Sequence, residues 1–257
     1  MRIVSYNVNG IRSNIKKGLL DWLAIQNPDI VCVQEIKLSE TDLVENSFQE
    51  LGYQCFWFSA VKKGYSGVAI FSKISPESVT LGMNIPIYDE EGRIIRINFP
   101  GFSVLSCYFP SGSSSTDRQE FKMKFLSDFY VFVENLKQNV DNLIIVGDIN
   151  ICHEAIDIHN PKTNANSSGF LPEERKWITD FLHLGFVDSF RFFNQEPHNY
   201  TWWTYRAGAK SKNLGWRIDY QIATPEFAEK AVATSVYKDE RFSDHAPLII
   251  DYANAGS

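Results

Sequence analysis

Long apolar runs are missing from this sequence, although 44% of its 257 residues are hydrophobic. No stretch reaches the ~18 consecutive apolar residues that a membrane-spanning helix needs, so we expect no membrane association. The opening residues, MRIVSYNVNG, lack the pattern of a secretory signal peptide. We therefore expect a cytoplasmic protein.

Cysteine is scarce, and the cysteines that are present lack the CxxC spacing of metal or redox sites. They are Cys32, Cys55, Cys107 and Cys152. Three of them stand in apolar, strand-like runs, which predicts buried free thiols rather than disulfides or a zinc site.

Positive charge is also in short supply, with 25 Lys and Arg against 31 Asp and Glu and a net charge of −6. This balance argues against a protein that coats nucleic acid non-specifically. It is compatible with an enzyme that has a local basic face and an acidic metal site. Apart from SGSSS at 111–115, the chain has no low-complexity stretch, and no Pro/Gly-rich linker divides it. We expect a single catalytic domain over 1–257, acting as a monomer.

Short β-rich runs recur along the chain, with helical patterns between some of them. The strand-like runs are 2–6, 30–34, 53–59, 67–72, 93–99, 102–108, 143–147, 218–223 and 246–252. The helical patterns cover 16–26, 116–139 and 172–185. Thr116 and Gln119 have capping-box spacing at the start of the second. This mixture predicts an α/β sandwich of two sheets faced by helices.

Polar residues stand repeatedly at the point where an apolar run ends. In NLIIVGDIN, residues 142–150, a run that looks like a buried strand leads directly to Asp148 and Asn150. The other cases are Asn7 and Asn9 after 2–6, Glu35 after 30–34, Tyr108 after 102–107, Asp219 within 218–223, and Asp244 and His245 before 246–252. Ligand groups in sheet proteins collect at strand ends. If these ends share one edge, they form a single pocket of carboxylates, amides, a phenol and an imidazole.

Such a set of side chains suits the hydrolysis of a phosphodiester. That reaction needs an activated water, in-line geometry and stabilisation of charge on the phosphoryl oxygens. A hard divalent cation with oxygen ligands supplies the last of these. Glu35 is the first candidate ligand, with Asn9 and Asp244 near it.

Proton transfer would fall to the remaining members of the set. Asp148 is favoured as the base because a carboxylate is ionised at neutral pH and a phenol is not, and Asn150 would orient the water. His245, paired with Asp219, would donate to a phosphoryl oxygen. Tyr108 would hydrogen-bond the phosphate or assist the leaving oxygen. Taken singly, each of these residues has an ordinary explanation as part of a turn, a cap or the core.

Taken together, the motifs resemble the exonuclease III and apurinic/apyrimidinic endonuclease family, within the endonuclease/exonuclease/phosphatase superfamily. They are NVNGIR (7–12), VQEIK (33–37), GYSGVAIFSK (64–73), YFPSG (108–112), GDIN (147–150), HEAIDIHNPK (153–162), GFLPEER (169–175), YTWWTYRAGAKSKNLGWRIDY (200–220) and SDHAPL (243–248). They follow the family's order over nearly the whole chain. GDxN and SDH alone would indicate only the superfamily, which includes inositol-phosphate and sphingomyelin phosphodiesterases.

The resemblance implies a four-layered α/β sandwich, with two mixed β-sheets packed face to face and flanked by helices. It also implies Mg²⁺-dependent hydrolysis, with Mn²⁺ as a substitute, of the phosphodiester 5′ to abasic sites in duplex DNA. Exonuclease activity from 3′ to 5′ and trimming of 3′ ends would accompany it. By motif match, the catalytic residues are Tyr108, Asp148, Asn150, Asp219 and His245, and the metal ligands are Glu35, Asn9 and Asp244. Asn9 stands where relatives often have Asp, and a neutral amide is the weaker ligand for a hard cation.

Recognition of the damaged strand is expected from the later motifs. The segment 205–217 holds Arg206, Lys210, Lys212 and Arg217 and no acidic residue. This predicts phosphate contacts along a duplex, with a solvated loop as the alternative. We expect Arg206 to fill the gap left by an extruded nucleotide.

An abasic sugar has no base edge to read, so it needs a tight apolar slot into which it is rotated. The resemblance places Trp202, Trp216 and Ile218 at that slot, with Phe170 nearby and Gly169 leaving space at its edge. Further expected substrate-binding residues are Asn7, Arg118 and Asn164. Ser111 stands where some relatives have Asn or Gln.

Two other functions compete with a repair nuclease. One is a superfamily phosphodiesterase that acts on a lipid or inositol phosphate, and the motif block at 200–220 argues against it. The other is a catalytically inactive DNA-binding homologue, which would be expected to lose Glu35, Asp148, Asp219 or His245. All four residues are present.

Overall fold

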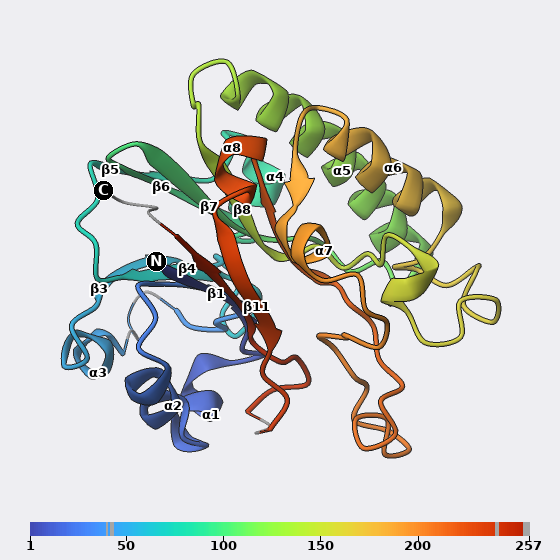
Figure 1. The fold of residues 1–257 in the computed structure, drawn as a ribbon, viewed down its shortest axis with the longest axis horizontal. Coiled ribbons are helices and arrows are strands. Elements are labelled where there is room, and N and C mark those ends of the chain that lie inside the picture. The colour runs from blue at the N-terminus through green and yellow to red at the C-terminus, as the bar shows by residue number, and fades with distance from the viewer. Residues whose placement is uncertain (40, 42–43, 240–241, 254–257) are drawn as a thin grey trace.

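Two six-stranded β-sheets form the centre of the computed structural model, which describes residues 1–39, 41, 44–239 and 242–253 (Figure 1). The first sheet has the order β11 (Ala231–Val236), β12 (Leu248–Tyr252), β1 (Arg2–Asn7), β2 (Ile30–Gln34), β4 (Val68–Ser72), β3 (Gln54–Phe58). The second has the order β5 (Ser78–Leu81), β6 (Ile94–Phe99), β7 (Phe102–Tyr108), β8 (Leu143–Asp148), β10 (Asp219–Ala223), β9 (Val187–Asp188). Both sheets are mixed, because β1–β2 and β7–β8 are parallel and the other pairs are antiparallel.

Helices cover the outer face of each sheet. Helices α1 (Ile11–Lys16), α2 (Leu19–Gln26) and α3 (Glu45–Gln49) pack on the first sheet, and α4 (Pro86–Asp89), α5 (Thr116–Leu136) and α6 (Pro172–Leu182) pack on the second. Helices α7 (Ser189–Phe193) and α8 (Pro225–Ala228) add Phe190 and Phe227 to the layer between the sheets. A short 3₁₀ helix, η2 (Ala155–Asp157), follows β8. No helix in the described part of the chain is long and apolar enough to cross a membrane.

Successive side chains of each central strand point alternately to the two faces of the sheet, and both faces are buried. Ile144 and Val146 of β8 pack between the sheets, whereas Leu143 and Ile145 pack under α5 and α6. A strand buried on both faces reads as a continuous apolar run, which is why the central strands were visible in the sequence. The predicted four-layered sandwich is confirmed. The cysteines are free, as predicted, with Cys55 only half-buried.

The differences from the predicted elements have local causes. Strands β5, β9 and β11 were missed because they are short or lie at sheet edges with exposed residues. The predicted helix at 16–26 begins only at Leu19, because Gly18 has a φ of +102° and separates α1 from α2. The predicted capping box at Thr116 is wrong. Ser115 caps α5 instead, and its hydroxyl accepts a hydrogen bond from the Arg118 amide at 3.2 Å.

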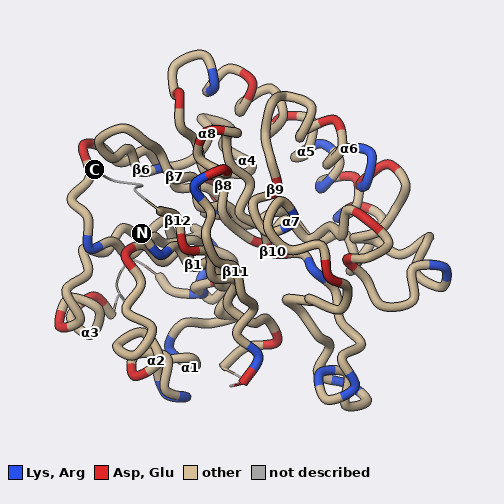
Figure 2. Tube along the Cα trace, in the orientation of Figure 1, with Lys and Arg blue, Asp and Glu red and all other residues tan. Residues whose placement is uncertain are grey.

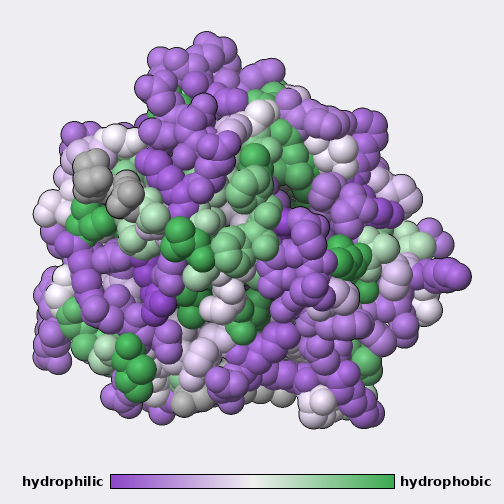
Figure 3. Space-filling model, in the orientation of Figure 1, coloured by the Kyte–Doolittle hydropathy of each residue, from purple (hydrophilic) through white to green (hydrophobic). Residues whose placement is uncertain are grey.

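The surface in view is mostly hydrophilic, interrupted by apolar patches (Figure 3). Exposed large apolar side chains include Phe192, Phe193 and Val232. Lys and Arg gather at the tip of the long loop before β10, at the lower right of Figure 2. The tip of this loop is therefore basic even though the whole chain is acidic.

Gly147 is required by the close approach of β8 to β7. It pairs with Cys107, and a Cβ atom added to it would overlap the Cys107 carbonyl oxygen. That oxygen cannot move without breaking the pairing of β7 and β8. We expect Gly147→Ala to lower the free energy of unfolding by about 3 kcal/mol, at the upper end of the range for overpacking.

Gly101→Ala is the matched control in a urea-unfolding measurement. Gly101 has a positive φ of +80° and nothing near its added Cβ, so only the backbone cost of about 1 kcal/mol should appear. Equal losses in the two variants would contradict the steric account.

Candidate active site

The strand ends that the sequence singled out meet at one edge of the sandwich. Asp148 at the end of β8 lies in register with Tyr108 of β7 on one side and with Asp219 of β10 on the other. Asn7 at the end of β1 lies in register with Gln34 of β2. The two parallel pairs end at this edge, so the polar residues that follow them enter one cleft of about 830 Å³.

Asp148 is held by hydrogen bonds from both sheets. Its Oδ1 accepts a hydrogen bond from the backbone amide of Asn150 at 2.9 Å. Its Oδ2 accepts hydrogen bonds from Asn7 Nδ2 at 2.9 Å and from Asn150 Nδ2 at 3.3 Å. Asn150 Nδ2 also donates to the Phe109 carbonyl at 3.0 Å. Asn150 has a left-handed φ of +57°, so the chain turns sharply after β8. The GDIN stretch is therefore a turn that fixes a buried carboxylate.

His245 lies between two carboxylates. Its Nδ1 is 2.8 Å from Asp219 Oδ2, and its Nε2 is 3.7 Å from Asp148 Oδ2. Burial lowers the pKa of His245, but the charges of Asp219 and Asp148 and the hydrogen bond to Asp219 outweigh it and raise the pKa to about 10. The imidazole is therefore protonated at neutral pH and can donate from Nε2.

Burial also sets the proton affinity of Asp148 and Tyr108. Burial and the neighbouring acidic charges raise the pKa of Asp148 to about 7, against the opposing effect of His245. A carboxyl with a pKa near the working pH is suited to general-base chemistry. Burial, followed by the charges of Glu35 and Asp148, raises the pKa of Tyr108 well above its usual value. The phenol is therefore a hydrogen-bond donor and not a base.

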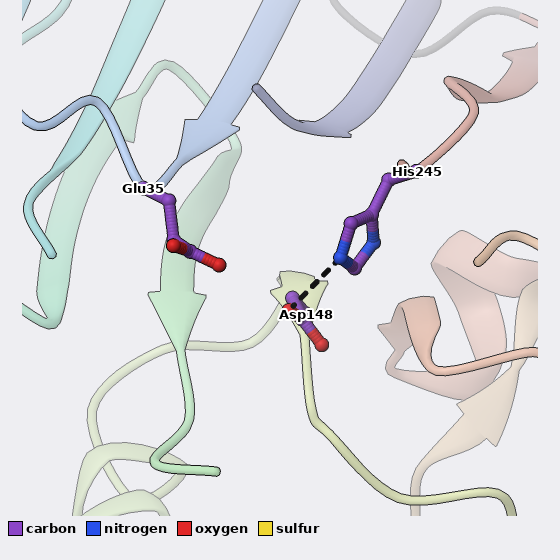
Figure 4. A group of neighbouring side chains, drawn as sticks. All are labelled: Glu35, Asp148 and His245. Carbon is purple, nitrogen blue, oxygen red and sulfur yellow. Dashed lines mark ion pairs between the residues drawn. The ribbon is translucent and has the colours of Figure 1, made fainter. Parts of the chain in front are cut away.

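Glu35, Asp148 and His245 form the cluster in which a metal site is expected, since one potential ligand atom of each lies within 4.8 Å of the others. Figure 4 shows them entering the same space from three separate segments, with His245 directed at Asp148. Asn7 Nδ2 donates to Glu35 Oε1 at 2.8 Å and so joins the two carboxylates. Lys37 Nζ lies 3.1 Å from Glu35 Oε2.

The donor set fits a hard divalent cation. The carboxylates of Glu35 and Asp148 are the oxygen ligands that Mg²⁺ prefers, with the remaining positions left to water and substrate phosphate. His245 is engaged with Asp219 through Nδ1 and faces Asp148 through Nε2. The predicted ligands Asn9 and Asp244 lie beside this cluster and bond each other at 2.9 Å. Asn9 Oδ1 accepts from Lys37, and Asp244 Oδ2 accepts Trp202 Nε1 at 3.0 Å.

An apolar slot adjoins the carboxylates in the same cleft. Trp202, Trp216 and Ile218 line it, and the two indoles meet edge to face with centroids 6.1 Å apart. Phe170 is buried behind them. Gly169 has a φ of +93°, and a Cβ there would lie 3.0 Å from Trp216. The lining of the cleft is also rich in hydroxyls, which come from Ser111, Ser113, Ser114, Ser115, Thr116, Ser167 and Ser168.

The other predicted DNA-contacting residues lie outside the lining of this cleft. Arg206 and Lys212 are exposed on the loop before β10, and Lys210 stacks on Trp203 at 5.6 Å. Arg118 pairs with Glu91 at 3.1 Å. Asn164 bonds the backbone of its own loop, donating to the His159 carbonyl at 2.9 Å.

Sequence reasoning missed several members of the site. Lys37 is part of the VQEIK motif but was given no role, and, apart from Ser111, the serine-rich run at 111–115 was noted only for its composition. Gln119 lines the cleft next to Ser168 and bonds it at 2.6 Å. Its only signal was its position in the first turn of a predicted helix.

The predicted phosphate contact by Arg217 is wrong. Its side chain is buried and pairs with Asp157 at 2.7 Å and Asp188 at 2.8 Å. It faces away from the slot because its neighbours Trp216 and Ile218 occupy the cleft side of the chain. The ion pairs of Arg217 therefore hold in place the chain segment that carries Trp216 and Ile218.

Asp157 pairs with two arginines, because besides Arg217 it also lies 2.7 Å from Arg191. Burial raises the pKa of Asp157, but the two arginines outweigh this and lower it to about 2. We expect Asp157→Asn to cost about 3 kcal/mol at pH 7, the lower end for removing one partner of a buried ion pair, because Asp188 stays beside Arg217. Chemical denaturation measures the loss.

The pH dependence of that loss follows from the direction of the shift. A depressed folded-state pKa gives stability that is full above the unfolded value of about 3.8 and is lost as the pH falls toward the folded value. The difference between wild type and Asp157→Asn should therefore narrow from pH 4 toward pH 2. A difference that stayed constant over that range would contradict the assigned role of the carboxylate.

Known proteins resemble this chain over nearly its whole length. The chain is 38% identical over 250 residues to an exodeoxyribonuclease of Bacillus subtilis, covering 96% of this chain and 98% of that protein. It is 37% identical over 253 residues to the DNA repair nuclease APEX1 of Danio rerio, covering 97% and 81%.

A solved structure of an AP endonuclease from Archaeoglobus fulgidus matches with a TM-score of 0.91 and 32% identity, covering 98% of this chain and 99% of that one. A 3′ phosphatase from Neisseria, bound to a product DNA hairpin, matches with a TM-score of 0.92, 29% identity and the same coverage. The family model for the endonuclease/exonuclease/phosphatase family matches residues 4–245. The chain therefore belongs to the endonuclease/exonuclease/phosphatase family.

Proposed function

We propose that this protein is a Mg²⁺-dependent DNA-repair nuclease that hydrolyses the phosphodiester 5′ to abasic sites in duplex DNA. We include 3′-to-5′ exonuclease and 3′-end trimming in the proposal. The observation that carries it is the apolar slot of Trp202, Trp216 and Ile218 in the same cleft as Asp148 and His245. Support also comes from relatives named as an exodeoxyribonuclease and as a DNA-(apurinic or apyrimidinic site) endonuclease.

The slot supports selection of a nucleotide that lacks its base. An abasic nucleotide is unpaired, so extruding it from the helix costs little. Two indoles and an isoleucine offer a narrow apolar surface to its sugar, and Gly169 keeps the edge of the slot open. A slot that fits the sugar closely would exclude a nucleotide that keeps its base.

The proton transfers are assigned from the hydrogen bonds and the pKa directions. Asp148 removes a proton from the attacking water, which Asn150 helps to orient. His245, protonated and held by Asp219, donates to a phosphoryl oxygen. As the bond between phosphorus and the 3′ oxygen breaks, Tyr108 keeps its proton and donates a hydrogen bond to the phosphate or to the leaving oxygen, which takes its proton from solvent.

Of the two carboxylates, Glu35 would hold the cation, with Asn9 and Asp244 beside it, and Asp148 would be left free to act as the base. Mg²⁺ in that position, or Mn²⁺ in its place, neutralises charge that develops on the phosphoryl oxygens. Lys37 lies against Glu35 and Asn9, so its ammonium must yield when a cation binds. This competition is electrostatic and can be tested by substitution.

The duplex would extend from the cleft over the neighbouring loops. Arg206, Lys210 and Lys212 bring the positive charge that phosphate contacts require, and Arg206 would prop the gap left by the extruded nucleotide. Arg118 and Asn164 are proposed as further contacts. We also propose that 1–257 act as one catalytic domain and as a monomer. The expected cytoplasmic location stays a prediction.

The experiment uses a duplex with one central abasic-site analogue, an undamaged duplex and a duplex with a recessed 3′ end, each with Mg²⁺ and with EDTA. We expect a Mg²⁺-dependent nick at the lesion and slower shortening from the 3′ end. Asp148→Asn should lower the nicking rate by about 10²–10⁴, the usual contribution of a general base. Shortening without a nick would overturn the endonuclease assignment, and no cleavage of any duplex would favour a non-DNA phosphodiester or an inactive homologue.

Cation binding by Glu35 has its own prediction. Glu35→Gln should weaken Mn²⁺ binding by at least about tenfold, the lower end for loss of one partner at a metal site. Lys37→Met is the matched control, because removing the neighbouring ammonium should leave the affinity equal or higher. Calorimetric titration of the DNA-free protein measures both. Unchanged affinity in Glu35→Gln would place the cation elsewhere.

A further inference from the structure

A fully buried ion pair connects two helices next to the candidate active site. Lys122 of α5 and Glu174 of α6 lie 2.6 Å apart, and both side chains are 0% exposed. The two helices run side by side on the outer face of the second sheet (Figure 1). Replacing a buried ion pair by apolar residues is often neutral or stabilising. Stability alone therefore gives little reason for charges at this position.

Glu174 holds the loop that forms the edge of the slot. Its Oε2 accepts the backbone amides of Gly169 at 2.6 Å and Leu171 at 3.0 Å. Its Oε1 accepts Lys122 Nζ and Gln119 Nε2. The bond to Leu171 is the ordinary cap of α6. The bond to Gly169 lies beyond that cap and fixes a residue that packs against Trp216.

Lys122 holds the loop that carries the catalytic candidates. Besides Glu174, its ammonium donates to the Asn150 carbonyl at 2.8 Å. A Cβ on Gly169 would lie 3.1 Å from that same carbonyl oxygen, and the Cys152 amide donates to the Gly169 carbonyl at 2.8 Å. The slot loop and the loop after Asp148 therefore meet at one point, and the ion pair binds both.

We propose that Lys122 and Glu174 are a positioning pair that fixes the sugar slot relative to Asp148 and Asn150 and thereby determines discrimination between abasic and base-bearing nucleotides. The inference rests on the proposed nuclease function. Neither side chain lines the cleft, so the pair acts through the residues that it holds, chiefly Asn150 and Gly169. A misplacement of about 1 Å between a bound group and a catalytic group can cost about 10²-fold in rate.

The first test compares two rates for the same enzyme preparation. They are the rate of nicking at an abasic site and the rate of removal of base-bearing nucleotides from a recessed 3′ end. Their ratio does not depend on the fraction of folded protein, so a merely structural role would leave it unchanged. In Lys122→Met and in Glu174→Gln, we expect the ratio to fall by about tenfold or more, with kcat more affected than KM.

The double variant Lys122→Met with Glu174→Gln protects the test against simple unfolding, because it leaves no buried charge unpaired. It should fold, and its ratio should resemble those of the single variants, because contacting partners do not add. Lys124→Met is the matched control, since Lys124 lies on the same helix but is exposed and pairs with Asp128. An unchanged ratio in the double variant would overturn the proposal.

Amide hydrogen exchange separates this proposal from the proposed function. Exchange at Gly169 should accelerate in Lys122→Met and in the double variant while central β8 amides stay protected. If the wild-type enzyme did not nick abasic DNA, the proposed function would fail, and exchange would still decide on the ion pair. Unchanged exchange at Gly169 would then overturn its positioning role, and selective acceleration would support it.

Discussion

A hydrogen bond from Asn7 to Asp148 joins the two sheets at the edge where the site forms. Asn7 ends a strand of the first sheet, and Asp148 ends a strand of the second. The same amide nitrogen donates to Glu35, so one side chain sets the spacing of the two carboxylates that are candidates for a cation. The pairing of β8 with β7 and β10 then places Tyr108 and Asp219 on either side of Asp148.

Asp148 and His245 are both buried, but neighbouring charges offset the cost of burying their charged forms to different extents. Asp148 lacks a full counter-charge and gains proton affinity from burial, whereas His245 lies between two carboxylates and keeps its proton. A protonated imidazole and a carboxyl with raised proton affinity thus stand side by side, as the proposed hydrolysis near neutral pH would require. On the slot side, the charges of Asp157 and Asp188 neutralise Arg217, which lies buried next to Trp216 in the chain.

The sequence alone was sufficient to predict those strands and site residues whose pattern reflects local burial. Central strands such as β8 are apolar on both faces, and the polar residues after them marked the edge of the site. Exposed edge strands such as β5 have no such pattern. The role of Arg217 was predicted wrongly because the sequence shows its charge but not the direction in which its side chain points. The pair of Lys122 and Glu174 could not be foreseen, since 52 residues separate its members and only the packing of α5 on α6 brings them together.

The most direct test of the account is cleavage of an abasic duplex in H₂¹⁸O, followed by mass spectrometry of the ends at the nick. Attack on phosphorus by a water that Asp148 has activated predicts a 3′-hydroxyl on one side and a single ¹⁸O in the 5′-phosphate on the other. A 3′-unsaturated aldehyde, or a 5′-phosphate without ¹⁸O, would show that the strand breaks by elimination. That result would contradict the assignment of this cleft to phosphodiester hydrolysis.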